Sequence, residues 1–176
     1  MAFSTYADTL HYLYAQLPMF TRVGASAYKK DLHNTLALCN ALHHPEHKFK
    51  SVHIGGTNGK GSSSHMLAAI LQTAGYKTGL YTSPHLRDFR ERIRINGQMI
   101  PEQEVINFVN SHQALFEEIN PSFFEATVGL AFDYFAKQGV DIAIIEEGLG
   151  GRLDSTNVIN PLLSLITNIG LDHLDI

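Results

Sequence analysis

"HIGGTNGKGSSS", residues 53–64, is the stretch that decides the fold of this 176-residue chain. It holds four glycines, one lysine and four hydroxyl side chains, and it begins inside the short apolar segment "KSVHI". A strand, a glycine loop, a lysine and then a helix is the order found in phosphate-binding loops. In such loops the glycines let backbone N–H groups turn toward an anion, and the helix N-terminus adds partial positive charge. The stretch therefore predicts a site for nucleotide phosphates rather than a plain strand-to-helix turn.

The loop departs from the standard pattern G-x-x-x-x-G-K-[ST]. Ile54 stands where the first glycine would be, and Gly61 follows Lys60 where a serine or threonine would be. A P-loop kinase or GTPase would need the full pattern, and a GTPase would also need N-K-x-D, which the sequence lacks. The departure indicates a variant class of phosphate-binding loop.

Helical and strand patterns alternate along the rest of the chain. Helices are predicted over residues 6–17, 27–42, 62–75, 101–119 and 122–139. Strands are predicted over 50–54, 77–83, 140–147 and 162–169, and the last two have the continuous apolar runs of buried strands. A small β-hairpin is expected to turn at Asn96–Gly97, and Pro101 is expected at the first helical position of its helix. This order predicts an α/β fold with a P-loop NTPase-like, mostly parallel sheet that helices flank on both faces.

Composition excludes several classes of function. Hydrophobic residues make up 44% of the chain and charged residues 17%, with a formal net charge of −4, so no broad basic surface predicts nucleic-acid binding. The ten histidines show no Cys/His spacing typical of zinc sites, and the single cysteine, Cys39, fits a reducing compartment. No signal peptide and no apolar run of membrane-spanning length is present. The composition is typical of a soluble, cytoplasmic protein.

Candidate metal ligands follow three of the predicted strands. A triphosphate at the loop needs Mg²⁺, and Mg²⁺ prefers oxygen ligands. Glu146 and Glu147 end the run "VDIAII", and only one of them can face the metal because neighbours on a strand point to opposite sides. Ser83 follows another strand, and His173 follows the last one, at the edge where ligands collect in open α/β sheets.

Six blocks in order together resemble one family. "GTNGKGS", "YTSPHL", "RERIRING", "FFEATV", "EEGLGGRLDSTNVI" and "TNIGLDHLD" are similar to segments of the folylpolyglutamate synthase / dihydrofolate synthase family, relatives of the Mur ligases. The resemblance implies an ATP-dependent amide ligase that adds L-glutamate to the carboxylate of dihydropteroate or a reduced folate. In this reaction ATP phosphorylates the carboxylate, and the amine of glutamate then displaces phosphate from the acyl phosphate. Which of the two acceptors is used stays open.

The same resemblance implies roles for individual residues. The ATP-binding set is Thr57, Asn58, Gly59, Lys60, Gly61 and Ser62. The Mg²⁺ ligands are Ser83, Glu146 and His173, and the catalytic set is Lys60, Glu146 and His173. The pterin pocket is lined by Ser122, Phe123, Phe124, Glu125, Leu153, Asp154 and Ser155. The strip 83–92 resembles a mobile loop beside the site, whose "RDFRER" either steers anionic substrates or forms a solvated turn.

The resemblance also sets an expectation for domains and assembly. Residues 1–176 resemble the N-terminal, Mur-ligase-like ATP-binding domain of the family. In family members, a carbamylated lysine and a C-terminal domain follow the segment that this sequence matches. We therefore expect this chain to be a fragment, inactive as a ligase by itself, and the family implies a monomer. Two alternatives stay open: a non-catalytic nucleotide-binding module, and a Mur-type ligase for another carboxylate.

Overall fold

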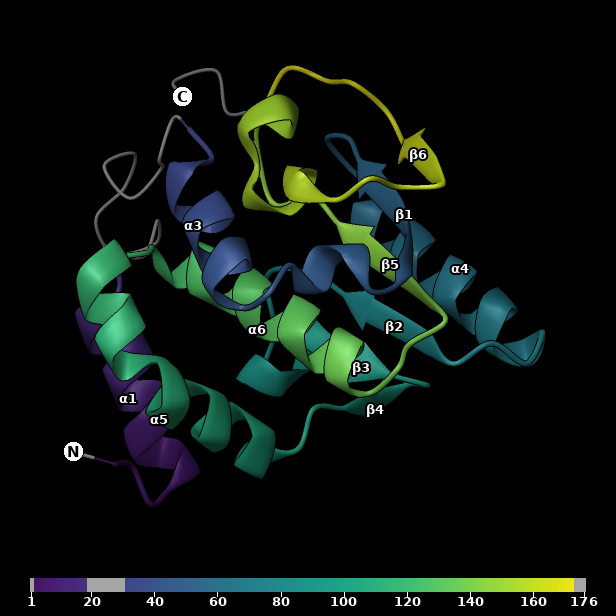
Figure 1. The fold of residues 1–176 in the computed structure, drawn as a ribbon. Helices are drawn as coiled ribbons and strands as arrows, with labels where there is room; N and C mark the ends of the chain where they lie inside the picture. The colour runs from purple at the N-terminus through teal and green to yellow at the C-terminus, as the bar shows by residue number, and fades with distance from the viewer. Residues whose placement is uncertain (1, 19–30, 173–176) are drawn as a thin grey trace.

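A six-stranded sheet in the order β4-β3-β2-β5-β1-β6 crosses the computed structural model, which describes residues 2–18 and 31–172 (Figure 1). Strands β2, β5, β1 and β6 are parallel, whereas β3 and β4 add an antiparallel edge. The strands are β1 (Lys50–Gly55), β2 (Thr78–Tyr81), β3 (Ile93–Ile95), β4 (Gln98–Met99), β5 (Ile142–Glu146) and β6 (Leu163–Ile166). The predicted α/β class with a mostly parallel sheet is confirmed.

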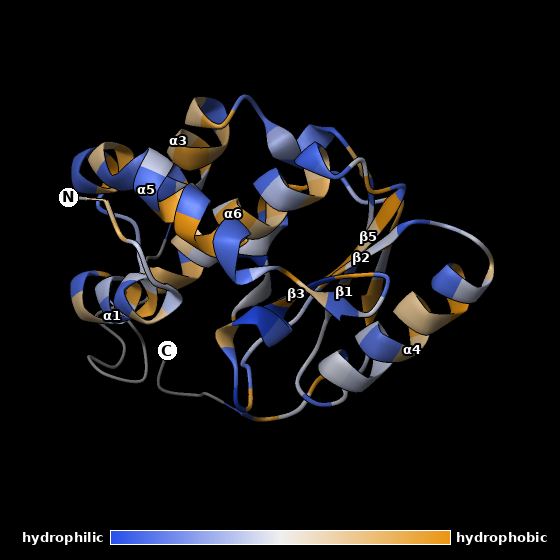
Figure 2. Cartoon of the chain, turned by 90° about the horizontal axis from the view of Figure 1, so that it is seen from below, coloured by the Kyte–Doolittle hydropathy of each residue, from blue (hydrophilic) through white to orange (hydrophobic). Residues whose placement is uncertain are grey.

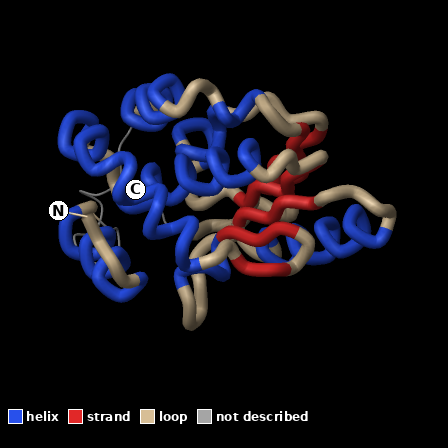
Figure 3. The backbone as a smooth tube through the Cα atoms, turned by 60° about the horizontal axis from the view of Figure 1, so that its bottom comes forward, coloured by secondary structure: helices blue, strands red, loops and turns tan. Residues whose placement is uncertain are grey.

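Helices cover both faces of this sheet, as predicted (Figure 3). In Figure 1, α4 lies on one face, and α6 lies on the other together with α3, α5 and α1. The helices are α1 (Tyr6–Gln16), α3 (His33–Ala41), α4 (Lys60–Thr73), α5 (Glu102–Ile119) and α6 (Phe123–Lys137). The described residues also form the 3₁₀ turns η2 (Pro45–His47), η3 (Phe89–Arg92), η4 (Gly151–Leu153) and η5 (Ser155–Val158).

The two faces carry apolar cores of different extent. On the α6 face, fully buried side chains such as Phe132, Phe135 and Ile145 belong to one large cluster that reaches α1, α3 and α5. On the α4 face, a small cluster joins the sheet to Ala68 of the helix, through residues such as Ile54 and Ile144. Most apolar burial, and so most hydrophobic stabilisation, therefore lies on the α6 face.

Local sequence signals account for where several elements begin or turn. The Thr5 side chain accepts a hydrogen bond from the Asp8 amide at the start of α1, which is the contact that an N-cap supplies. The hairpin between β3 and β4 turns at Asn96 and Gly97, whose φ angles are 49° and 75°. A two-residue turn with positive φ at both positions matches the twist of the strands, so the predicted Asn-Gly hairpin is confirmed.

The observed helices differ from the predicted ranges in three places. The helix expected over 27–42 is observed as α3, with residues 27–30 outside the described part of the chain. The helix expected from residue 62 begins at Lys60, because Gly59 adopts the left-handed conformation that ends the loop there. Pro101 is the N-cap of α5 with extended ψ, not its first helical residue. Each difference concerns an element's boundary and not its type.

The prediction that residues 162–169 form a buried strand is wrong. β6 pairs only with β1 and forms the edge of the sheet. Leu163 is 55% exposed and Ile166 is 66% exposed. An apolar run of this kind is the same in the sequence whether or not something covers it, so periodicity alone could not locate the exposed edge.

Candidate functional site

The carboxyl ends of β1, β2, β5 and β6 meet at one edge of the sheet, and every described loop that the motifs singled out as nucleotide- or metal-binding leaves from that edge. The register pairs Ile54 of β1 with Glu146 of β5, and Gly55 of β1 with Ile166 of β6. The glycine loop (residues 55–59) begins at the last residue of β1, Ser83 is the second residue after β2, and Glu146 is the last residue of β5. Ligands of open α/β sheets bind at this kind of edge.

The glycine loop passes directly into the N-terminus of α4. Gly59 has φ 83° and caps the helix without a side chain. The first intrahelical bond observed runs from the Ser63 amide to Gly59 O, at 3.0 Å. By helix geometry, the amides of Gly59, Lys60, Gly61 and Ser62 have no acceptor within the helix. Together with the helix dipole, these four donors suit a phosphate group.

Close approach explains the two glycines that begin the loop. A Cβ on Gly55 would collide with the Glu147 carboxylate, and a Cβ on Gly56 would collide with Thr167 Oγ1. Gly56 also has φ 128°, which side chains rarely allow. Packing and backbone conformation therefore require glycine at position 56, whereas a side chain at position 55 would require the Glu147 side chain to move.

Segment 167–170, which follows β6, forms hydrogen bonds with Thr57 and Asn58 of the glycine loop. The amide of Thr57 donates to Asn168 O at 2.9 Å, and the amide of Asn58 donates to Asn168 Oδ1 at 3.0 Å. Thr167 Oγ1 donates to Asn58 O at 2.7 Å, and the Gly170 amide donates to Thr57 Oγ1 at 2.9 Å. The amides of Thr57 and Asn58 are therefore already used within the protein, so the donors left for a phosphate are those of the helix start.

Lys60 is the first residue of α4, and its side chain folds back over the loop. Its ammonium group donates to Gly56 O at 2.6 Å and to Thr57 O at 3.3 Å. These carbonyls hold the positive charge above the glycine loop, beside the free amides. A mobile ammonium in this position can turn to a phosphate oxygen, which is the role expected from the sequence.

Glu146 is a buried carboxylate facing the same helix start. Its exposed fraction is 4%, and its Oε2 accepts the amide of Ser83 at 3.1 Å. Its Oε1 lies 3.5 Å from the place where a Cβ on Gly61 would be. Burial raises the pKa of the Glu146 carboxyl, and the Ser83 amide and the Lys60 charge only partly offset this effect. A desolvated carboxylate with one oxygen toward the phosphate amides is suited to a cation.

The residues present fit Mg²⁺. Glu146 offers a hard carboxylate oxygen, and the hydrogen bond from its neighbour Ser83 keeps that residue's hydroxyl close by. The structure thus brings two of the three predicted ligands together. The third, His173, lies outside the described residues.

Glu147 points away from Glu146, as the alternation of a strand predicts. Its carboxylate accepts the Gly151 amide and lies against Gly55. It therefore holds the turn at residues 148–151 against the end of β1. This geometry agrees with the choice of Glu146 as the residue nearer to the phosphates.

The "SFFE" block forms the start of α6. Ser122 Oγ accepts the Glu125 amide at 3.2 Å, and Glu125 Oε2 accepts the Ser122 amide at 2.6 Å, which together make a capping box. Phe123 is buried in the core, whereas Phe124 is half-buried beside Tyr81 at 6.2 Å between ring centroids. Of these four residues, Phe124 is the one whose ring lies partly open to a ligand.

Asp154 organises the turn that precedes η5. Its carboxylate accepts the amides of Gly148 at 3.0 Å and Leu149 at 2.7 Å, and also the amide and hydroxyl of Thr156. Burial raises the pKa of Asp154, and its hydrogen bonds only partly offset this. Leu153 and Ser155, the other two residues predicted for the pterin pocket, flank it and are half-buried.

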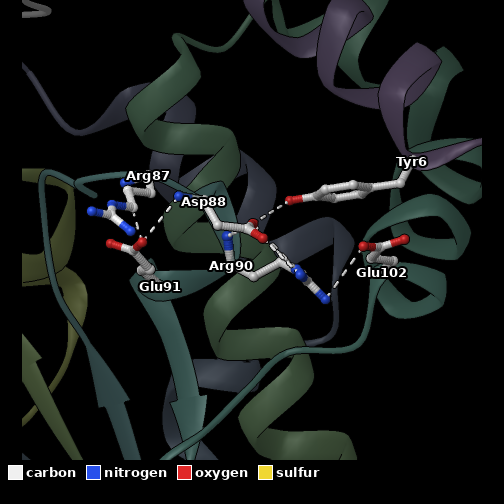
Figure 4. Close-up of polar contacts among 6 residues, drawn as sticks. All are labelled: Tyr6, Arg87, Asp88, Arg90, Glu91 and Glu102. Carbon is white, nitrogen blue, oxygen red and sulfur yellow. Dashed lines mark hydrogen bonds and ion pairs between the residues drawn. The ribbon is translucent and has the colours of Figure 1, made fainter.

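The strip 83–92 is anchored along its second half (Figure 4). Asp88 accepts the Tyr6 hydroxyl at 2.9 Å and the Arg90 guanidinium at 2.6 Å, and Arg90 also pairs with Glu102 at 3.4 Å. The Arg90 partner holds the pKa of the Asp88 carboxyl well below its usual range. These contacts tie the strip to α1 and α5, so "RDFRER" is not simply a solvated turn.

A polar cluster beside Phe123 was not foreseen from the sequence. Arg92 is 7% exposed, donates to His85 Nδ1 at 2.7 Å and lies over the Phe123 ring at 5.3 Å. In another part of the structure, His53 Nε2 lies 2.8 Å from Thr156 Oγ1. The contacts of Arg92 with Phe123 and of His53 with Thr156 join residues far apart in the chain, and no local pattern marks them.

Comparisons with known proteins identify the family of this chain. The model of the Mur ligase middle domain matches residues 54–176, which is more than half of the chain. The chain belongs to the Mur ligase family. It is 40% identical to the dihydrofolate synthase/folylpolyglutamate synthase of Bacillus subtilis over 99% of this chain and 40% of that protein. The resemblance to the folate-type synthases of this family is confirmed.

Solved structures give the same result for the fold. The crystal structure of folylpolyglutamate synthase from Thermotoga maritima is 43% identical, with a TM-score of 0.83 over 93% of this chain and 38% of that one. A complex of folylpolyglutamate synthase with AMPPCP and folate is 36% identical, with a TM-score of 0.88 over 98% of this chain and 42% of that one. This Mur ligase chain spans about two-fifths of the length of these relatives.

The described helices also bear on membranes. None of them, within residues 2–18 and 31–172, combines the length and the apolar character that crossing a bilayer would require.

Proposed function

We propose that this Mur ligase chain carries the ATP site of a ligase that adds L-glutamate to the carboxylate of dihydropteroate or a reduced folate. The observation that carries the proposal is the pairing of the α4 N-terminus with the buried Glu146 carboxylate at one sheet edge. Relatives named as dihydrofolate and folylpolyglutamate synthases are 40% and 37% identical to this chain over 99% and 96% of its length. A similar structure was solved with an ATP analogue and folate.

In this proposal the helix start receives the phosphates of ATP. The free amides of Gly59, Lys60, Gly61 and Ser62 donate to phosphate oxygens, and the Lys60 ammonium leaves the loop carbonyls for the transferring group. Thr57 and Asn58 shape the loop through segment 167–170. These amides and the Lys60 ammonium then stabilise the negative charge that develops on the phosphoryl group.

Mg²⁺ would be held by Glu146 and Ser83, with His173 as the third predicted ligand, and it would supply charge neutralisation for the triphosphate. The chain's own contribution is the orientation of Glu146, which the Ser83 amide fixes. Burial keeps this carboxylate poorly solvated, so it interacts strongly with a cation.

The proposed reaction has two steps. An oxygen of the acceptor carboxylate attacks the γ-phosphorus of ATP, and ADP leaves. The amine of glutamate then attacks the carbonyl of the acyl phosphate, loses a proton, and displaces inorganic phosphate. The pterin ring is proposed to lie beside the half-buried Phe124, because a flat heterocycle stacks on an aromatic face.

The test is ADP release by the product of the complete gene, with Mg-ATP, glutamate and either dihydropteroate or tetrahydrofolate. Release that requires both the pterin and glutamate is the expected result, and comparison of the two acceptors identifies the substrate. Bound ATP without any pterin-dependent release would reject the proposal in favour of a nucleotide-binding module or a ligase for another carboxylate.

A further inference from the structure

The connection between α3 and β1 holds a second cluster of metal-binding side chains, remote from the ATP site. His44, Glu46 and His47 lie in and beside η2, and their ligand atoms all fall within 4.8 Å of one another. η2 packs against α6 and precedes the amino end of β1. The glycine loop follows the carboxyl end of the same strand, so the six residues of β1 separate the two places.

The spacing of the three side chains suits a single ion. Glu46 Oε1 lies 3.0 Å from His44 Nδ1 and 3.5 Å from His47 Nε2. A metal bound through bonds of about 2.0–2.1 Å at tetrahedral angles holds neighbouring ligand atoms about 3.3 Å apart. The two measured distances lie on either side of that value, and the two exposed imidazoles, whose rings stack with centroids 5.6 Å apart, are free to adjust by rotation.

The carboxylate in the centre is not satisfied by its protein neighbours. The Glu46 side chain is only 3% exposed, and its Oε2 has no hydrogen-bond partner among the described residues. A buried carboxylate oxygen without a partner is costly. Both imidazoles converge on the other oxygen, Oε1, so a cation held there stabilises the negative charge of this desolvated carboxylate.

We propose that His44, Glu46 and His47 bind one Zn²⁺ ion. Two imidazole nitrogens with one carboxylate oxygen are ligands that zinc accepts, whereas Mg²⁺ prefers oxygen alone. Solvent supplies the fourth ligand, since His44 and His47 are 53% and 60% exposed. The ion joins the end of α3 to the start of β1 and stabilises that connection against α6.

The chain offers a closely matched control for this site. His43 adjoins His44, is also exposed and also has a left-handed backbone, with φ 61° against 52° for His44. Asparagine tolerates that conformation, so His43→Asn and His44→Asn carry the same backbone demand. Only His44 belongs to the cluster.

The test is a calorimetric titration of the untagged protein with Zn²⁺ in a large excess of Mg²⁺, which occupies oxygen-rich sites such as the one at Glu146. Wild type and His43→Asn should bind one Zn²⁺ per chain with equal affinity. His44→Asn and His47→Gln should each weaken binding at least tenfold and lose the rise in Tm that Zn²⁺ gives the wild type.

Two results would overturn the proposal: no saturable Zn²⁺ binding by the wild type, or the same affinity in His44→Asn, His47→Gln and the control. Because both cluster variants change exposed side chains, they should fold even if Glu46→Gln does not.

Discussion

The two faces of the sheet differ in what holds their helices in place. α6 buries eleven of its 15 residues, whereas α4 buries only Ser64 and Ala68 of its 14. Met66 and Ile70 of α4 are 61% and 64% exposed, and Figure 2 shows this helix apart from the group of helices on the other face. The α6 face therefore supplies most of the hydrophobic stabilisation, whereas α4 packs on the sheet through a smaller apolar cluster around Ala68.

The largest effect is expected from a cavity on the α6 face. Phe132→Ala removes a fully buried ring that packs 5.8 Å from Phe49, and should lower the free energy of unfolding by about 3–5 kcal/mol. Ile70→Ala, on the exposed side of α4, should change it by less than about 0.5 kcal/mol. Urea unfolding of both variants measures the difference. Similar losses in the two would mean that the α4 face is packed as firmly as the other.

The next largest effect is a loss of activity at the glycine loop that leaves stability almost unchanged. Lys60→Ala removes the ammonium above the loop and should reduce glutamate-dependent ADP release by about 10²–10³-fold, with little change in Tm, since α4 contributes few buried contacts. Lys50→Ala, at the exposed amino end of β1, is the control and should keep the wild-type rate. If Lys60→Ala turned over normally, the assignment of the phosphate site would be wrong.

The smallest effect distinguishes the two acids at the end of β5. Glu146→Gln should reduce ADP release by about 10²-fold, and Glu147→Gln much less, because glutamine can still accept the Gly151 amide.

Burial raises the folded-state pKa of Glu146, so the folded protein binds more protons there than the unfolded chain does. Its contribution to stability therefore falls as the pH rises through that pKa.

Thermal melts over a range of pH check the same residue. At neutral pH, Glu146→Gln should melt at a higher temperature than the wild type, and the difference should shrink as the solution is made acidic. Equal activity losses in the two glutamine variants would contradict the view of Glu146 as a desolvated cation ligand. A Glu146→Gln variant with a lower Tm than the wild type would contradict it as well.

The sequence predicted those features whose cause is local. The glycine loop, the Asn96–Gly97 turn and the alternation of Glu146 and Glu147 all follow from backbone geometry within a few residues. The type of every long element was also predictable, because periodicity depends on neighbours three or four residues away.

Features whose cause is distant could not be predicted. Asn168 bonds to the glycine loop across 110 residues, and Arg92 lies over the ring of Phe123, which belongs to a different element. The exposed strand β6 has the same apolar sequence pattern as a buried strand, so its exposure could not be predicted. The cluster at His44 was missed because three ligands from one turn match no familiar zinc spacing.

The bonds between the glycine loop and segment 167–170 have a consequence for folding order. Residues 53–64 leave the ribosome long before Asn168, yet the loop depends on that residue for two of its hydrogen bonds. Contacts this distant along the chain form slowly, because a long loop must close first. The sheet around β1, β2 and β5 can assemble earlier, so we expect a nascent chain to form its sheet before the glycine loop takes its final shape.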